Sequence, residues 1–546
     1  MRSTHYCFLF FSLLLLASAT TFGQSLSVGR VSGSFQSDVQ YLFEDPIIGA
    51  DDVEERVLSN TYMQLTYQQG AFTAGLRYEA FLNPLLGYDT RYEGQGIANR
   101  YFSYNSEKLD VTAGNFYDQF GNGLIFRSYW AWALGIDNSI DGVRMNLRPR
   151  KGIQIKSILG KQRNFFELGE SLIRGADVEV NVRDIVGEKL GEKTYLILGA
   201  SVLNKFQEDD DAVLQLPENV SAFSGRFDFT KGRFNLNGEY AYKINDPISL
   251  NDFVYNPGNA FFVNTSFAQK GIGYNLTIKR SDNFDFRSQR DASLQALTLN
   301  FIPPGTRLHT YRLPTLYPYA TQFNGELGFQ GTIFYRIPKK TKLGGKYGTL
   351  VQLNFSRFHG LDKDFAEDGF TYNASFLGDP SDLYFQDINV EINHKWSKTV
   401  KSQLTYIWLL YNKDIIEFGS PNAGFGIVNT HIGVLETQFR LKKRISLRTE
   451  LQHMYTRQDL GSWVMALAEL SISPHGFISI FDEWNYGNPD PANRVHYYNA
   501  AFTYVFKSNR IALSYARQRR GLLCVGGICR EVPASNGFNL SVSSTF

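Results

Sequence analysis

The sequence predicts a large antiparallel β-barrel that spans a membrane, and three observations carry this prediction. Apolar and polar side chains alternate along nearly the whole chain, as they do in strands with one apolar and one polar face. The chain is polar on average, with a mean hydropathy of −0.25, yet it is 15% aromatic. Short turns separate the alternating segments, and the repeated apolar runs of about 20 residues that membrane helices need do not occur.

Composition excludes several other classes of protein. Lys and Arg number 55 and Asp and Glu number 53, so the net charge of +2 provides no overall field for nucleic acid. The aromatic content is too high for a disordered chain. A length of 546 residues is typical of several soluble domains, but no linker or charge block divides the chain. We therefore expect one barrel domain over residues 24–546.

Residues 1–23 have the features of a signal peptide. Arg2 supplies the positive charge, residues 6–17 form the apolar stretch, and small residues at Thr21 and Gly23 favour cleavage before Gln24. The alternative is a membrane anchor, for which the apolar run is too short. Export followed by insertion into the outer membrane is the predicted route.

The strand pattern also predicts the two ends of the barrel. Residues 28–43 place Val31 and Val39 on one face and Ser32 and Gln36 on the other. Tight turns alternate with long polar connections along the chain, and in outer-membrane barrels the short turns face the periplasm and the long loops face outside. Aromatic residues near the strand ends match an interfacial girdle, so we expect the apolar faces to meet lipid and the polar faces to line the lumen.

Counting segments predicts about 26 strands, within a range of 22–26. A closed barrel of this kind needs an even number of strands, and one strand is missing from the count between the strands predicted at 293–301 and 326–336. Residues 306–313 would supply it. The strand pattern begins by Val28, which leaves no residues for a separate plug at the N-terminus.

The chain ends with an alternating segment and a terminal aromatic residue. This resembles the C-terminal signal by which outer-membrane barrels reach their assembly machinery, which makes that machinery an expected partner. The residues of the predicted signal are Phe538, Leu540, Val542 and Phe546.

Two cysteines remain once the signal peptide is removed. Cys524 and Cys529 flank a Gly-Gly pair, and in an exported protein such a pair is most simply a disulfide that closes a small loop. Free thiols and a metal site are the alternatives, but no further His or Cys lies close by in sequence. We therefore predict a disulfide and no metal.

Charged residues two positions apart share a face of a strand and are candidates for the pore lining. The functional interpretation is a mixed-charge lining that tunes passage. The alternative is a lattice of cross-strand ion pairs that stiffens a wide wall. The candidates are Arg77, Glu79, Arg226, Asp228, Glu239, Arg448 and Glu450.

The segment 114–142 breaks the alternation and is rich in Gly and aromatic residues. It is too apolar for a free surface loop, so residues 114–140 could fold into the lumen as a constriction or dock a partner. The alternative is a loop that packs only for stability. The candidate residues are Phe120, Arg127, Tyr129, Trp130, Trp132 and Asp137.

No catalytic motif emerges from the sequence. The chain contains no HExxH, no CxxC and no Gly-x-Ser-x-Gly, and Lys340 and Tyr347 occupy positions where a phosphate-binding loop needs Gly and Ser or Thr. The acidic groups at 51–55 and 208–211 could bind divalent ions near lipopolysaccharide, although solvated loop faces are the more usual explanation. We predict no enzyme activity and no cofactor.

Several stretches carry a family resemblance. Residues 114–124 and 133–139, then 317–329 and 337–348, resemble a family of uncharacterised outer-membrane barrel proteins from Bacteroidota. The resemblance extends over essentially the whole mature chain. It implies an outer-membrane, porin-like barrel and no established activity.

Two functions remain open from the sequence. The first is an outer-membrane channel that passes small solutes, narrowed by the segment 114–140. The second is a structural barrel in an assembly, secretion or uptake complex that docks surface lipoproteins or other outer-membrane proteins. In both cases the expected surroundings are outer-membrane lipid and lipopolysaccharide, with no nucleic acid.

Overall fold

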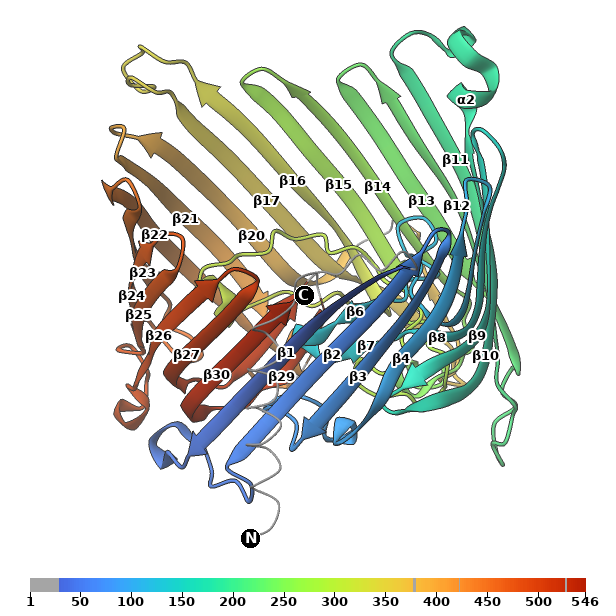
Figure 1. Cartoon of the computed structure of the whole chain (residues 1–546), viewed down its shortest axis with the longest axis horizontal. Helices are drawn as coiled ribbons and strands as arrows, with labels where there is room; N and C mark the ends of the chain where they lie inside the picture. The colour runs from blue at the N-terminus through green and yellow to red at the C-terminus, as the bar shows by residue number, and fades with distance from the viewer. Residues whose placement is uncertain (1–28, 377–379, 422, 526–527) are drawn as a thin grey trace.

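A computed structural model describes residues 29–376, 380–421, 423–525 and 528–546, so the predicted signal peptide lies outside the described residues. Twenty-four strands form one closed antiparallel sheet (Figure 1). The first strand pairs with the last, with Asp38 opposite Ser541, and this pairing closes the ring. Both ends of the wall therefore lie at the rim that carries the short turns.

The strands of the wall are β1 (Arg30–Phe43), β2 (Val57–Gln69), β3 (Phe72–Leu82), β4 (Gly94–Asn105), β5 (Leu109–Phe116), β8 (Ile140–Arg150), β9 (Ile153–Asn164), β10 (Glu167–Asn181), β11 (Thr194–Phe206), β12 (Asn219–Lys231), β13 (Phe234–Lys243), β14 (Gly258–Gln269), β15 (Ile272–Asp282), β16 (Gly325–Ile337), β17 (Thr349–Leu361), β20 (Pro380–Lys395), β21 (Val400–Asn412), β22 (Ile427–Lys442), β23 (Ile445–Tyr455), β24 (Trp463–Ile472), β25 (Gly476–Trp484), β26 (His496–Phe506), β27 (Asn509–Gln518) and β30 (Ser535–Thr545).

The remaining elements of the described residues lie in the connections between strands. Three small hairpins are β6 (Trp130–Ala131) with β7 (Ile136–Asp137), β18 (Lys363–Phe365) with β19 (Tyr372–Ala374), and β28 (Gly521–Val525) with β29 (Ile528–Val532). The helices are α2 (Val182–Val186), α3 (Lys413–Phe418), η1 (Pro46–Ile48), η2 (Thr90–Tyr92), η3 (Trp132–Leu134), η4 (Gly187–Leu190), η5 (Ser249–Asn251), η6 (Pro314–Leu316) and η7 (Pro491–Asn493). Among the described residues, no helix has the length and apolar character to cross a membrane.

The outer face of the wall is the apolar face. On β13, Tyr240 and Tyr242 are 46% and 40% exposed, whereas the adjacent Glu239 is 3% exposed and points inward. Exposed Leu, Ile, Phe and Tyr side chains recur at alternate positions on most strands of the wall. An apolar surface of this extent would be unfavourable in water and is typical of a wall that faces lipid.

The predicted fold class is confirmed, and the twenty-four strands lie within the predicted range of 22–26, two fewer than the central figure of about 26. Residues 293–301 and 306–313 form no strands, because β15 pairs directly with β16 and the segment 283–324 is inserted between them. Two physical features prevent strand formation here. Prolines at 303, 304, 314 and 318 lack the N–H that a ladder needs, and Leu294 and Leu297 have positive φ angles of 53° and 56°.

The inserted segment 283–324, which we call the strap, crosses the inside of the barrel. One half packs on the inner side of β8–β14, where Phe284 and Phe286 are fully buried. The other half packs on the inner side of β17–β24, where Leu313 and Tyr317 are buried. Figure 1 shows this coil in yellow-green within the ring of strands.

The wall therefore encloses an apolar core, contrary to the expectation of a polar inner face throughout. Ile407 and Leu409 of β21 are at most 1% exposed although they point inward. Burial changes along each strand of this sector. On β22 the inner-face residues near the long loops are buried, and those near the short turns, such as Gln438 and Arg440, are half-buried or exposed. In this sector the core thus lies next to the long loops.

Phe358 of β17 holds the strap against the wall. Its fully buried ring lies over Gly328 of β16 and Gly305 of the strap, where a Cβ atom at either glycine would collide with the ring. Because glycine has no side chain, Gly305 and Gly328 leave room for the ring. Tyr319 stacks on the same ring at 5.0 Å between centroids.

We expect Gly328→Val to destabilise the barrel by about 1–3 kcal/mol, because the added side chain forces the Phe358 ring out of its site. The free energy of unfolding, measured by urea titration of the folded barrel in lipid vesicles, checks this. Gly433→Val is the matched control, since Gly433 is also a strand glycine but a Cβ atom added to it would meet no other atom within 4 Å. An equal effect of both changes would contradict the packing described here.

Candidate functional site: a plugged lumen

Three inserted segments meet inside the barrel, and together we call them the plug. They are the strap, the loop 117–139, and the hairpin of β28 and β29. The strap and the loop are joined through the backbone, where Arg127 N donates to Leu299 O at 2.8 Å and Phe301 N donates to Gly123 O at 2.9 Å. Ile528 of the hairpin packs in one buried cluster with Leu134.

A ring of four buried charges fixes the loop 117–139 to the wall. Glu79 contacts Arg77 and Arg163, each at 2.7 Å, and Asp137 of the loop completes the ring by pairing with the same two arginines. All four side chains are at most 4% exposed. Trp130 of the loop lies over the Arg77 guanidinium at 4.2 Å. The ring carries no net charge, so it is tolerated at this depth.

Two tyrosines of the same loop stay protonated because they are buried. Burial raises the pKa of Tyr117, and Asp137, which accepts a hydrogen bond from its hydroxyl at 2.9 Å, raises that pKa further. Burial also raises the pKa of Tyr129 to about 12, against the opposing effect of Arg127. Both phenols therefore act as neutral hydrogen-bonding groups within the plug.

Basic side chains of the strap meet acidic side chains of the far wall. His309 Nε2 lies 2.5 Å from Asp387, and Arg312 binds Glu483 through two contacts of 2.8 and 2.9 Å. Arg307 pairs with Glu391 of the same wall. The carboxylates of Asp387 and Glu483 are fully buried, and each is bound by a strap residue; Glu483 also contacts Arg519 at 3.3 Å.

The other end of the strap is held by lysines of the near wall. Lys243 Nζ donates to the carbonyl of Asp285 at 2.5 Å, and the same lysine contacts Asp246 at 3.3 Å. Phe286 of the strap lies 5.7 Å from that ammonium group. Because polar contacts secure both ends, the strap is fixed to opposite sides of the barrel.

The predicted pore-lining residues lie in four places. Arg77 and Glu79 lie in the buried ring. Arg226 binds Asp177 of β10 at 2.7 Å, and Glu239 accepts from Asn122 N at 2.7 Å. Both side chains lie against Gly121, so these two residues adjoin the loop 117–139. Asp228 contacts Asn235 nearer the short turns. Arg448 and Glu450 pair with each other on the opposite wall, where Glu436 joins them at 3.2 Å from Arg448.

The predicted constriction residues lie mostly inside the plug. Phe120 is fully buried, and the Arg127 guanidinium lies between the rings of Tyr129 and Phe301, 4.8 and 4.0 Å away. Trp132 is 43% exposed and lies outside the buried clusters.

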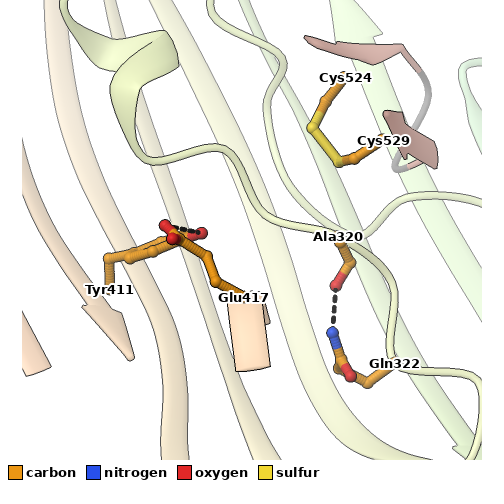
Figure 2. Close-up of a disulfide and its surroundings, with 6 residues drawn as sticks. All are labelled: Ala320, Gln322, Tyr411, Glu417, Cys524 and Cys529. Atoms are coloured by element: carbon orange, nitrogen blue, oxygen red, sulfur yellow. Dashed lines mark hydrogen bonds between the residues drawn. A yellow bond between two sulfur atoms is a disulfide. The ribbon is translucent and has the colours of Figure 1, made fainter. Parts of the chain in front are cut away.

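Cys524 and Cys529 are joined by a disulfide across the ends of β28 and β29 (Figure 2). The hairpin contacts η6 of the strap, and Figure 2 shows the strap residues Ala320 and Gln322 in the surroundings of the disulfide. Within the described ranges, no three His, Cys, Asp or Glu side chains gather as a metal site requires.

The predicted C-terminal signal lies on the closing strand. Phe538 is 45% exposed on the outer face, and Leu540 and Val542 follow on the same face. Phe546 exchanges two backbone hydrogen bonds with Gly33 of β1.

Sequence reasoning missed the strap anchors Arg307, His309 and Arg312. The alternation of their segment predicts a strand, whereas the chain runs there as part of the strap. The four prolines around it and the break in strand parity are the signals in the sequence that the chain leaves the wall here.

Comparisons with known proteins identify a family but no function. A model described as a family of unknown function, DUF6029, matches residues 3–546. No functionally curated protein matches the chain in sequence.

Solved structures that match this chain share little sequence with it and superpose on it only partly. The P pilus usher translocation pore PapC is 9% identical, with 94% of this chain and 99% of that chain covered and a TM-score of 0.42. A ferric enterobactin receptor from Pseudomonas aeruginosa is 10% identical, with 94% and 80% covered and the same TM-score. OccAB3 from Acinetobacter baumannii is 8% identical, with 95% and 100% covered and a TM-score of 0.33. Scores this low carry no argument about function.

We expect Asp137→Ala to cost about 3–5 kcal/mol of folding free energy, because it leaves two buried arginines to share one carboxylate. Urea titration in lipid vesicles measures the loss, and protease cleavage within 117–139 should increase. Asp52→Ala is the control, since Asp52 and Arg56 form an exposed pair worth at most about 1 kcal/mol. Equal stability of the two variants would contradict an anchoring role for the ring.

Proposed function

This chain belongs to DUF6029, a family of unknown function, and we propose that it is an outer-membrane barrel that passes small solutes through a lumen narrowed by the plug. The observation that carries the proposal is the strap, which crosses the lumen and is attached to opposite walls. A barrel that served only as a scaffold would not need a lumen filled in this way.

The apolar outer face supports placement in a membrane. In a closed ring every strand is hydrogen-bonded to a neighbour on both sides, so no backbone N–H or C=O group of a free edge faces lipid. The short turns would then face the periplasm and the long loops the outside, as in other outer-membrane barrels.

One sector of the wall remains accessible past the plug. On β26 and β27 no residue is buried, and on β30 and β1 the only buried residues are Gly537 and Leu42. The inner face of this sector carries small polar side chains, including Ser514, Asn539 and Ser541, which are partly exposed. We infer that solutes pass along these four strands, which we call the seam sector.

The hairpin of β28 and β29 lies at the long-loop end of the seam sector, because it connects β27 to β30. Its contacts with the strap segment η6 and with η3 of the loop 117–139 place it over the plug. The proposed route is therefore narrowest between this hairpin and the wall.

We expect replacement of residues 284–323 by a short Gly-Ser turn to raise single-channel conductance severalfold in planar bilayers. Asp282 and Gly325 are register partners, so a short turn can join β15 to β16 without disturbing the wall. Heat-modifiable gel migration tests whether the variant folds. If it does not, the triple change of Arg307, His309 and Arg312 to Ala should increase open-channel fluctuations. Shortening the exposed loop 51–55 is the control.

We expect Ser514→Trp to lower the conductance, because the indole would fill part of the seam sector. Leu513→Trp is the matched control, since Leu513 is the neighbouring residue on the outer face and is 48% exposed. Recordings in the same bilayers compare the two variants with the unmodified protein. Equal conductance of both variants would place the route elsewhere, and a silent unmodified barrel would contradict the channel itself.

A further inference from the structure

Three neighbouring short turns gather twelve Lys and Arg side chains and no Asp or Glu. They join β16 to β17, β20 to β21 and β22 to β23, and they are adjacent because β17 pairs with β20 and β21 pairs with β22. We call this set the basic arc. Its members are Arg336, Lys339, Lys340, Lys342, Lys346, Lys395, Lys398, Lys401, Arg440, Lys442, Lys443 and Arg444.

The positive charges of the basic arc are not neutralised by neighbouring carboxylates of the described residues. All twelve side chains are exposed, and none forms an ion pair with any carboxylate in the part of the chain that the structure describes. Arg448, by contrast, lies deeper on β23 and contacts both Glu436 and Glu450. The rim of the barrel is therefore strongly positive on this side, although the whole chain is nearly neutral.

Two of these lysines oppose each other directly. Lys395 of β20 and Lys401 of β21 are register partners, and like charges in this position destabilise a sheet. A bound anion would relieve this repulsion.

The arc is turned toward the lumen at its centre. Lys395 lies four residues after the buried Glu391, and Lys401 lies four residues before the buried Thr405, so both share the inner face of their strands. Tyr347 lies 4.9 Å from the Lys395 ammonium group and 5.9 Å from that of Lys346, which holds the first two turns together. The positive groups thus line one side of the short-turn mouth of the lumen.

We propose that the basic arc is a binding site for polyvalent anions that carry phosphate or carboxylate groups. Lys and Arg around a pore mouth attract anions and raise their local concentration. The proposal rests on the proposed channel function and deepens it, because it names the chemical class of solute that the mouth of the lumen would collect. Both free solutes and lipid headgroups can carry such phosphate or carboxylate groups. Because Lys395 and Lys401 point inward to the lumen, a solute is favoured.

Inorganic tripolyphosphate is a suitable probe, with binding measured by calorimetric titration of the barrel in phosphatidylcholine nanodiscs. We expect binding that weakens as salt is added, and a loss of affinity of about tenfold or more for the double variant Lys395→Gln, Lys401→Gln. The matched control neutralises Lys231 and Lys507, which lie in short turns outside the arc. This control should bind like the unmodified protein.

Unchanged affinity of the Lys395/Lys401 variant would overturn the proposal. Nanodiscs that contain phosphatidylglycerol distinguish the two sources of anion, because loss of tripolyphosphate binding in them would assign the arc to lipid headgroups and overturn the solute site. The titration needs no ion flow. A barrel that is silent in bilayers yet binds tripolyphosphate through Lys395 and Lys401 would contradict the channel and leave the anion site standing.

Discussion

Closure of the sheet is the constraint on which the rest of the structure depends. In a wall exposed to lipid, every strand must find a partner on both sides, because no water is present to satisfy a free edge. The pairing of β1 with β30 provides this, and it gives the twenty-four strands an even count with both ends at one rim. It also creates an interior that is too wide for the wall's own side chains to fill.

The plug occupies part of that interior near the long loops, and it is stabilised by apolar packing, as an ordinary protein core is. Phe284, Leu313 and Tyr317 of the strap pack against inward-facing apolar residues of the wall. The inner face of the wall is therefore largely apolar where the plug packs against it, and polar where it is exposed to solvent. Buried ion pairs, such as that of Arg312 with Glu483, fix the position of the strap rather than add much stability.

Some of the site could be predicted from the sequence, and some could not. The segment 114–142 was recognisable because its aromatic and Gly-rich composition breaks the alternation, and its residues Trp130 and Asp137 do meet Arg77 inside the barrel. The strap was missed, because residues 306–313 alternate as a strand does, although the prolines around them indicate that the chain leaves the wall. An alternation of apolar and polar residues indicates that an extended chain has two different faces. It does not indicate whether that chain pairs with a neighbouring strand or packs on the inner wall of a barrel.

The sequence by itself determined the fold class, the outward direction of the apolar faces and the alternation of tight turns with long connections. These are local properties, since a period of two and the residues of a tight turn lie close together in the chain. Only the tertiary structure decided the strand number, the course of the strap and the meeting of Arg77, Glu79, Arg163 and Asp137. These depend on contacts between segments far apart in sequence, which arise only when the ring closes.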